Sequence, residues 1–218
     1  MASNSSTSIR PDWQQALYTK PWIWLALLVC AHIVSRISIS AGMKWDESEQ
    51  ILWAQQLHLG YGPQPPLYTW MQWAVCQILG PSVLALALLK HLLIALTYCL
   101  AWLAGRELLD RKGAWWVAAG LLLMPPFGWD SLRDQTHTVM VTAMTMGLWW
   151  AVLRQVQKPQ VINFVWIGLF CGLGMLSKYS YAMLIGALFV ASMTVAQVRR
   201  AIFASGWWLA PLVELLLF

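Results

Sequence analysis

Long apolar segments follow one another along most of this chain. The hydrocarbon core of a bilayer is about 30 Å thick, and a helix needs roughly 20 apolar residues to cross it. Segments of about this length or somewhat shorter lie at 21–40, 82–104, 114–127, 136–153, 161–176, 179–198 and 206–218. Only 11% of the 218 residues are charged, against roughly 25% in soluble domains. The sequence therefore predicts an all-α polytopic membrane protein with about seven transmembrane helices.

Basic residues gather on one side of such a bundle, provided that 65–80 lies in the membrane interface as a short aromatic helix. That side receives Arg10, Lys20, Arg106, Arg111, Lys112, Arg154, Lys158, Arg199 and Arg200. The positive-inside rule makes it cytoplasmic, so residues 1–20 are predicted to form a cytoplasmic tail. A transmembrane domain then covers 21–218, and 41–80 forms its first extracytoplasmic loop. Most acidic residues fall on the extracytoplasmic side.

This loop begins with an acidic cluster, Asp46, Glu47 and Glu49. Asp46 before an apolar-periodic stretch, with Glu49 on the next turn, fits a helix start in which both carboxylates complement free N–H groups and the helix dipole. Capping explains Asp46 and Glu49 but not Glu47, nor the aromatic run around Pro65 that follows. The alternative is that the cluster carries out chemistry at the membrane surface.

The stretch "WDESEQILWAQQLHLGYGPQPPLYTW" resembles the first extracytoplasmic loop of family 39 glycosyltransferases of the C-type (GT-C), such as dolichyl-phosphate-mannose–protein mannosyltransferases and lipid A aminoarabinose transferases. The shared features are an acidic pair, here Asp46-Glu47, an interfacial helix over about 47–57, Gly60-Tyr61 and Pro65-Pro66-Leu67. "SLRDQTHTV" and "GLGMLSKYSYAML" resemble later parts of the family. Some members carry a lysine before the loop proline, where this chain has Gln64. Family members are about twice as long, so a further part of the protein is expected to follow.

The resemblance implies a membrane glycosyltransferase that moves a sugar from a polyprenyl-phosphate donor to a hydroxyl of a lipid, glycan or protein acceptor. The site would face the periplasm or exterior of a bacterial inner membrane. Asp46 is the candidate general base, and Glu47 is the second choice or fixes the loop. The substrate-binding candidates are Asp134, Lys178, Arg133, Tyr61 and Tyr179. Among these, Lys178 and Arg133 would stabilise the leaving phosphate. Besides donor and acceptor, membrane lipids are the expected partners, and nucleic acid is not.

Each candidate also has a purely structural interpretation. Asp134 suits the N-cap of the following span, and an isolated lysine or arginine commonly extends to the interface. His58 and His137 with Asp46 or Asp134 offer ligands for a divalent metal, but no ligand spacing supports one. No cofactor is therefore assigned. Lys90, inside the second span, requires a charged partner or a watery cavity, with Glu214 as the suggested partner. Arg36 and His32 are expected to point outward toward the headgroups.

Two other function classes fit the same composition. A transporter or flippase of a lipid-linked or small solute would share the spans and the intramembrane lysine. It would also be expected to show repeat symmetry with broken helices at the midplane, and no repeat is visible here. A structural membrane subunit would use its loop carboxylates only as caps. The resemblance favours the enzyme.

Overall fold

The computed structural model describes residues 21–125, 127–128 and 134–217, and every regular element within them is helical. A lone antiparallel bridge joins Tyr61 and Gln64. In chain order the elements are α2 (Pro21–Ile39), α3 (Trp45–Trp53), α4 (Leu67–Leu79), α5 (Val83–Leu108), α6 (Arg111–Gly120), the 3-10 helix η1 (Leu121–Leu123), α8 (His137–Gln157), α9 (Val161–Met175), α10 (Tyr181–Thr194), α11 (Ala196–Ile202) and α12 (Leu209–Leu217). The tail at 1–20 lies outside the described residues.

The expected all-helical membrane architecture is confirmed. In the described part of the chain, α2, α5 and α8 are each long and apolar enough to cross a membrane. A fourth span results if α10 and α11, which meet at an angle of 119°, are counted together. The helix α9 is apolar but shorter, and α6 and α12 are shorter than the segments from which they were predicted. The count of seven spans stays a prediction.

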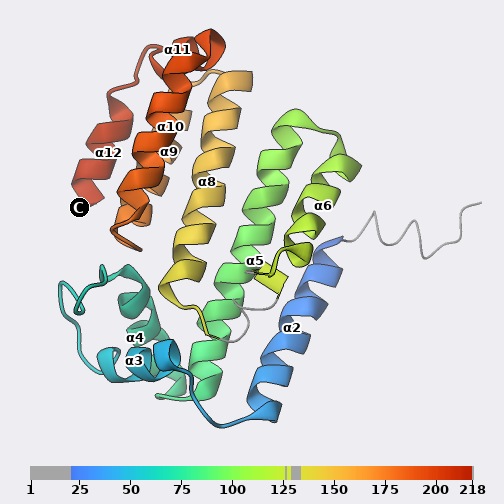
Figure 1. The fold of residues 1–218 in the computed structure, drawn as a ribbon, viewed down its shortest axis with the longest axis vertical. Coiled ribbons are helices and arrows are strands. Elements are labelled where there is room, and N and C mark those ends of the chain that lie inside the picture. The colour runs from blue at the N-terminus through green and yellow to red at the C-terminus, as the bar shows by residue number, and fades with distance from the viewer. Residues whose placement is uncertain (1–20, 126, 129–133, 218) are drawn as a thin grey trace, which may run out of the picture.

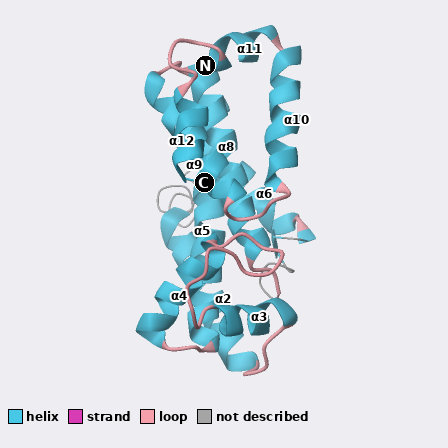
Figure 2. Ribbon diagram, turned by 90° about the vertical axis from the view of Figure 1, so that its left-hand side faces the viewer, coloured by secondary structure: helices cyan, strands magenta, loops and turns pink. Residues whose placement is uncertain are grey.

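The long helices run side by side, with α3 and α4 at one end of the bundle and α11 at the other (Figures 1 and 2). The core lies chiefly between α5 and α8, and the rings of Tyr68, Phe170 and Tyr181 complete it. Gly147 of α8 faces the Phe170 ring so closely that a side chain there would overlap it. A glycine at this position therefore lets α8 and α9 pack at short range.

A buried polar group joins the helices at the α11 end. The Gln155 side chain of α8 donates to the Ala201 carbonyl at 2.9 Å and accepts from Asn163 of α9 at 3.0 Å. Glu107 of α5 lies 3.8 Å from Arg154 and 3.6 Å from Lys158. The Gln155 hydrogen bonds satisfy polar groups that would otherwise lack partners between the helices.

The acidic loop folds differently from its prediction. The helix expected over about 47–57 begins earlier and ends earlier, as α3 over Trp45–Trp53. It ends because the Tyr61 hydroxyl donates to the Gln56 carbonyl at 2.7 Å and accepts from the His58 N–H at 2.9 Å, which fixes the chain in a turn. The helix α4 has 13 residues, a length of about 20 Å, which is too short to cross a bilayer core.

Candidate functional site

Glu47 lies at the centre of a buried ion-paired group that we call the Glu47 triad, formed with Arg36 of α2 and Lys90 of α5. The Lys90 Nζ donates to Glu47 Oε1 at 2.9 Å, and the Arg36 Nη2 lies 2.5 Å from Glu47 Oε2. The side chains of Lys90 and Glu47 are fully buried. Burial alone would raise the pKa of Glu47, but the Arg36 hydrogen bond and the Lys90 charge outweigh it and hold that pKa below its usual value. The triad joins α3 to two membrane helices.

Two expectations about these cations are wrong. Lys90 pairs with Glu47 and not with Glu214. Arg36 turns inward, where it also donates to the carbonyls of Ser40 at 2.7 Å and Gly42 at 3.0 Å. A single carboxylate within reach of two intramembrane cations provides a counter-ion for both. Contact with lipid headgroups would not provide one for Lys90, which lies inside its span. The contacts with Glu47, Ser40 and Gly42 use four of the five Arg36 N–H donors.

Asp46 does not cap its own helix, contrary to the interpretation from sequence. The N-cap of α3 is Lys44, and Glu47 occupies the third helical position, where its Oε2 accepts from the Lys44 N–H at 3.3 Å. Glu49, the predicted partner of the cap, is exposed. The helix starts before Asp46 because Glu47, held by the triad, satisfies the free N–H group at that point.

The Asp46 carboxylate instead faces the start of α8, where the Thr136 N–H is its hydrogen-bond donor. Partial burial, and then the nearby charge of Asp134, raise the pKa of Asp46, while Thr136, Lys90 and Lys178 oppose the rise. Asp134 and Lys178, from separate segments, therefore lie near enough to Asp46 for their charges to act on its carboxylate. We call Asp46, Asp134 and Lys178 the Asp46 cluster.

Asp134 does not cap α8 either, because the N-cap residue is Thr136. Its Oδ1 is buried and has no hydrogen-bond partner among the residues that the structure describes. A buried carboxylate oxygen without a donor is uncommon, and the charge of this carboxylate acts on Asp46. Arg133, the neighbouring phosphate candidate, lies outside the described residues.

Lys178 lies in the turn between α9 and α10, on the side of the bundle that carries α3. Its Nζ donates to Thr138 Oγ1 at 3.2 Å. An ammonium group has three donors, so this contact leaves others for a ligand. Tyr179 beside it is exposed, whereas the Tyr61 hydroxyl already binds two backbone groups.

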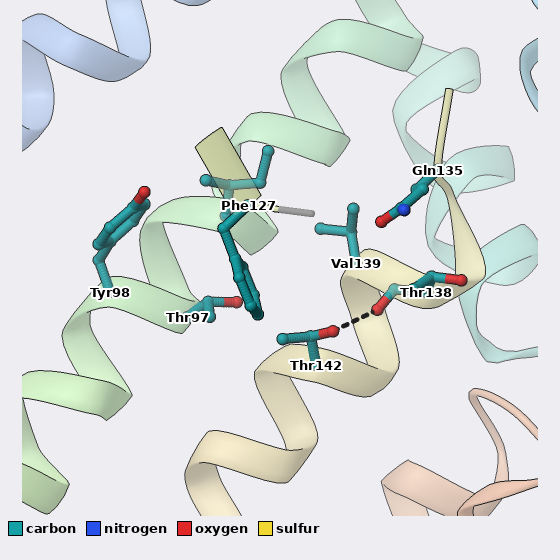
Figure 3. Close-up of a pocket in the computed structure, with 8 residues that line it drawn as sticks. Thr97, Tyr98, Phe127, Gln135, Thr138, Val139 and Thr142 are labelled. Atoms are coloured by element: carbon teal, nitrogen blue, oxygen red, sulfur yellow. Dashed lines mark hydrogen bonds between the residues drawn. The ribbon is translucent and has the colours of Figure 1, made fainter. Parts of the chain in front are cut away.

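A cavity of about 40 Å³ lies between α5 and α8, next to the Lys178 contact (Figure 3). The hydroxyl-bearing residues Thr97, Tyr98, Thr138 and Thr142 line it together with Gln135, and Phe127 lies across it. This volume admits a few water molecules. Tyr98 also borders an open apolar groove of about 370 Å³ between α2, α5 and α6, whose lining includes Trp24, Trp115 and Trp116.

Within the described ranges, no group of three or more histidine, cysteine, aspartate or glutamate side chains is placed to hold a metal ion. The His137 Nε2 instead lies 2.9 Å from the Gln50 Nε2, and His58 contacts the Tyr61 ring.

Gln50 and Thr69 are missed by reasoning from sequence. Both are fully buried, and Thr69 Oγ1 donates to Gln50 Oε1 at 3.0 Å. One signal was available, since Glu47, Gln50 and Ala54 share a helix face by their spacing. That face is the buried one, so its two polar residues needed partners in the fold.

Comparison with known proteins gives two findings. Residues 63–218 match the family described as dolichyl-phosphate-mannose-protein mannosyltransferase. Three lipopolysaccharide-modifying enzymes of Rhizobium johnstonii are also similar to the chain. The core galacturonosyltransferase RgtB is 35% identical over 83% of this chain, and RgtA is 34% identical over 81%. The lipid A galacturonosyltransferase RgtD is 23% identical over 72%.

The chain spans 37%, 36% and 33% of the lengths of these relatives, respectively. No solved structure matches it.

Proposed function

Because the chain belongs to the dolichyl-phosphate-mannose-protein mannosyltransferase family, we propose that it is a membrane glycosyltransferase using a polyprenyl-phosphate-linked sugar. The acceptor would be a hydroxyl group on the extracytoplasmic side. The observation that carries this proposal is the Asp46 cluster, which brings a carboxylate of raised pKa near a lysine whose one hydrogen bond among the described residues is to Thr138. A general base and a cation for a leaving phosphate are the two groups that such a transfer requires.

In the proposed reaction, Asp46 takes the proton from the acceptor hydroxyl. The oxygen of that hydroxyl attacks the anomeric carbon of the donor sugar. The bond between that carbon and the phosphate oxygen breaks, and polyprenyl phosphate leaves with the electron pair. Lys178 stabilises the charge that grows on the phosphate. Asp134, whose Oδ1 has no partner within the described ranges, is proposed to accept a hydrogen bond from a sugar hydroxyl. Glu47 is assigned to holding α3, because both of its oxygens already bind cations.

The apolar groove between α2, α5 and α6 suits the polyprenyl tail. It is open, aromatic and about 370 Å³ in volume, and Tyr98 lines both this groove and the hydroxyl-lined cavity. A donor with its phosphate near Lys178 would place polar atoms on the cavity side and its tail on the groove side. This division matches the two chemical halves of a lipid-linked sugar.

For the whole domain we propose the arrangement expected from the sequence, with about seven spans over 21–218 and the loop 41–80 outside the cytoplasm. The position of α3 and α4 at one end of the bundle (Figure 1) and the shortness of α4 support their placement in the interface. The basic residues at the opposite end support its cytoplasmic location.

Cysteine labelling tests this orientation. With the four native cysteines replaced by alanine, Glu49→Cys should react with a membrane-impermeant thiol reagent added outside intact cells. Arg111→Cys, at the opposite end, should react only after permeabilisation, because charged reagents do not cross the bilayer. The reverse labelling pattern would exclude the proposed extracytoplasmic site.

For the sugar, we propose galacturonic acid, and for the acceptor a hydroxyl of a lipopolysaccharide core or lipid A glycan. The support is similarity to three galacturonosyltransferases. Mass spectrometry of lipopolysaccharide from a deletion strain of the host bacterium tests this proposal. Galacturonic acid should disappear from one position and return with the wild-type gene. An unchanged glycan in the deletion strain would refute the proposal, and loss of a different sugar would refute the donor assignment.

Lys178→Ala is expected to weaken use of the lipid donor. A hydrogen bond to a charged group contributes about 1.5–3 kcal/mol, so kcat/KM for the donor should fall roughly tenfold to a hundredfold. The matched control is Arg200→Ala, which removes an exposed cation near the other end of the bundle. Transfer kinetics at varied donor concentration provide the measurement. Equal losses in both variants would indicate a general effect of charge and not phosphate binding.

A further inference from the structure

Gln50 joins the helix that carries Asp46 to two other parts of the bundle. Its side chain is fully buried, its Oε1 accepts from Thr69 of α4 at 3.0 Å, and its Nε2 lies 2.9 Å from His137 Nε2 of α8. An amide nitrogen only donates, so the His137 Nε2 must be the acceptor.

His137 continues this connection toward Lys178. The backbone of Ser177 lies near the imidazole, whose buried Nδ1 has no hydrogen bond of ordinary geometry within the described residues. Ser177 is itself fully buried and precedes Lys178 in the turn between α9 and α10. The Tyr68 ring packs on the other side of the imidazole, with 5.3 Å between ring centroids. His137 thus fills the space between α3 and the Lys178 turn.

The attachment of α3 is mainly polar. The two side chains that the helix buries, Glu47 and Gln50, are both polar. Glu47 fixes the helix to α2 and α5 through the triad, and Gln50 fixes it to α4 and α8. Among the described residues, the buried apolar cluster at this helix is small and consists of Ala54, Cys76 and Ala85 with three partly buried neighbours. Hydrogen bonds are directional, so these contacts set the orientation of α3 more closely than such a small apolar contact can.

We propose that Gln50 is a positioning residue, which with His137 fixes the separation between Asp46 and Lys178. The inference rests on the proposed function, since it concerns the distance between the proposed base and the proposed phosphate ligand. A catalytic group misplaced by about 1 Å can cost roughly a hundredfold in rate. Gln50→Leu, which keeps the approximate size of the side chain but removes both hydrogen bonds, should therefore lower kcat by about tenfold to a hundredfold.

A matched control is available at the opposite end of the bundle. Gln155 is also a buried glutamine with hydrogen bonds to two other segments. Gln155→Leu removes a comparable set of hydrogen bonds far from the Asp46 cluster. It should lower thermal stability to a similar degree while kcat of the folded fraction stays within about twofold of wild type.

A double-mutant cycle separates positioning from a loss of stability. If Gln50 acts through the placement of Asp46, Gln50→Leu should cost less than about twofold in kcat when Asp46 is already asparagine. A full additional loss in the Asp46→Asn background would overturn the proposal. The same would follow if Gln155→Leu lowered kcat as much as Gln50→Leu.

A distance measurement keeps this inference independent of the reaction assignment. Spin labels at Glu49→Cys and Ser180→Cys, both exposed sites, report the separation of α3 from the Lys178 turn in the cysteine-free protein. Gln50→Leu should shift or broaden the distance distribution, and Gln155→Leu should not. An unchanged distribution in Gln50→Leu would refute the positioning role. If the distribution shifts but Asp46→Asn retains full activity, Asp46 is refuted as the base while the positioning role of Gln50 is supported.

Discussion

Replacing Glu47 with alanine is expected to remove most of the folded protein. The change leaves Lys90 fully buried without its counter-ion and removes the carboxylate partner of Arg36. Breaking a buried ion pair by deleting one partner costs about 3–5 kcal/mol, a large part of the roughly 5–15 kcal/mol that stabilises a typical protein. Size-exclusion profiles of detergent extracts should show little monodisperse protein for Glu47→Ala.

The control for this prediction lies on the same helix. Glu49→Ala removes an exposed carboxylate and should behave like wild type in the same assay. Converting the pair to neutral groups of similar size, with Glu47→Gln and Lys90→Met together, should recover part of the folded yield because no buried charge of that pair remains. Normal yield and stability of Glu47→Ala would contradict the structural role of the triad.

Asp46→Asn is expected to lower the transfer rate by about a hundredfold to ten-thousandfold, the usual contribution of a general base. Asparagine keeps the shape of the side chain and an oxygen that can accept from the Thr136 N–H, so folding should be little changed. The matched control is Glu49→Gln, which neutralises a neighbouring exposed carboxylate and should leave the rate near normal. Initial rates with purified variants provide the measurement. A full rate for Asp46→Asn would show that this residue only accepts a hydrogen bond at the start of α8 and is not the base.

The same assignment predicts a pH effect. A general base acts in its ionised form, and burial together with Asp134 raises the pKa of Asp46. As the pH is lowered, activity should therefore be lost at a higher pH than it would be with an ordinary aspartate as the base, because the pKa of such an aspartate is about 3.9. Glu47, whose pKa is lowered by its cationic partners, should keep its charge through this pH range, so the triad stays intact while Asp46 is protonated.

The membrane helices were predictable because the requirement for about 20 apolar residues per span acts on contiguous sequence. The start of α5 at Val83 and that of α8 at His137 each lie within one residue of the segments expected from the apolar runs. The ends of α3 were not predictable in this way. Its start depends on Glu47 being held by distant cations, and its end depends on a hydroxyl contact from Tyr61.

Partners of the site residues were harder to predict than the helices. Lys90 was recognised as needing a partner, since an intramembrane charge is costly, but Glu47 lies 43 positions away in sequence. Gln50 and His137 are separated by 87 positions. Such pairs follow from how the helices pack, and a single sequence carries no local pattern that identifies them. The family resemblance drew attention to Asp46 and Glu47 but did not separate their roles.

The most direct test of the central claim is a transfer assay with the purified protein in lipid vesicles. The reaction would contain a lipopolysaccharide acceptor and galacturonic acid linked either to polyprenyl phosphate or to a nucleotide, with the product identified by mass spectrometry. We expect sugar transfer from the polyprenyl-phosphate donor alone, and a rate at least about a hundredfold lower in Asp46→Asn. Transfer from the nucleotide donor, with none from the polyprenyl-phosphate donor, would contradict the proposed function.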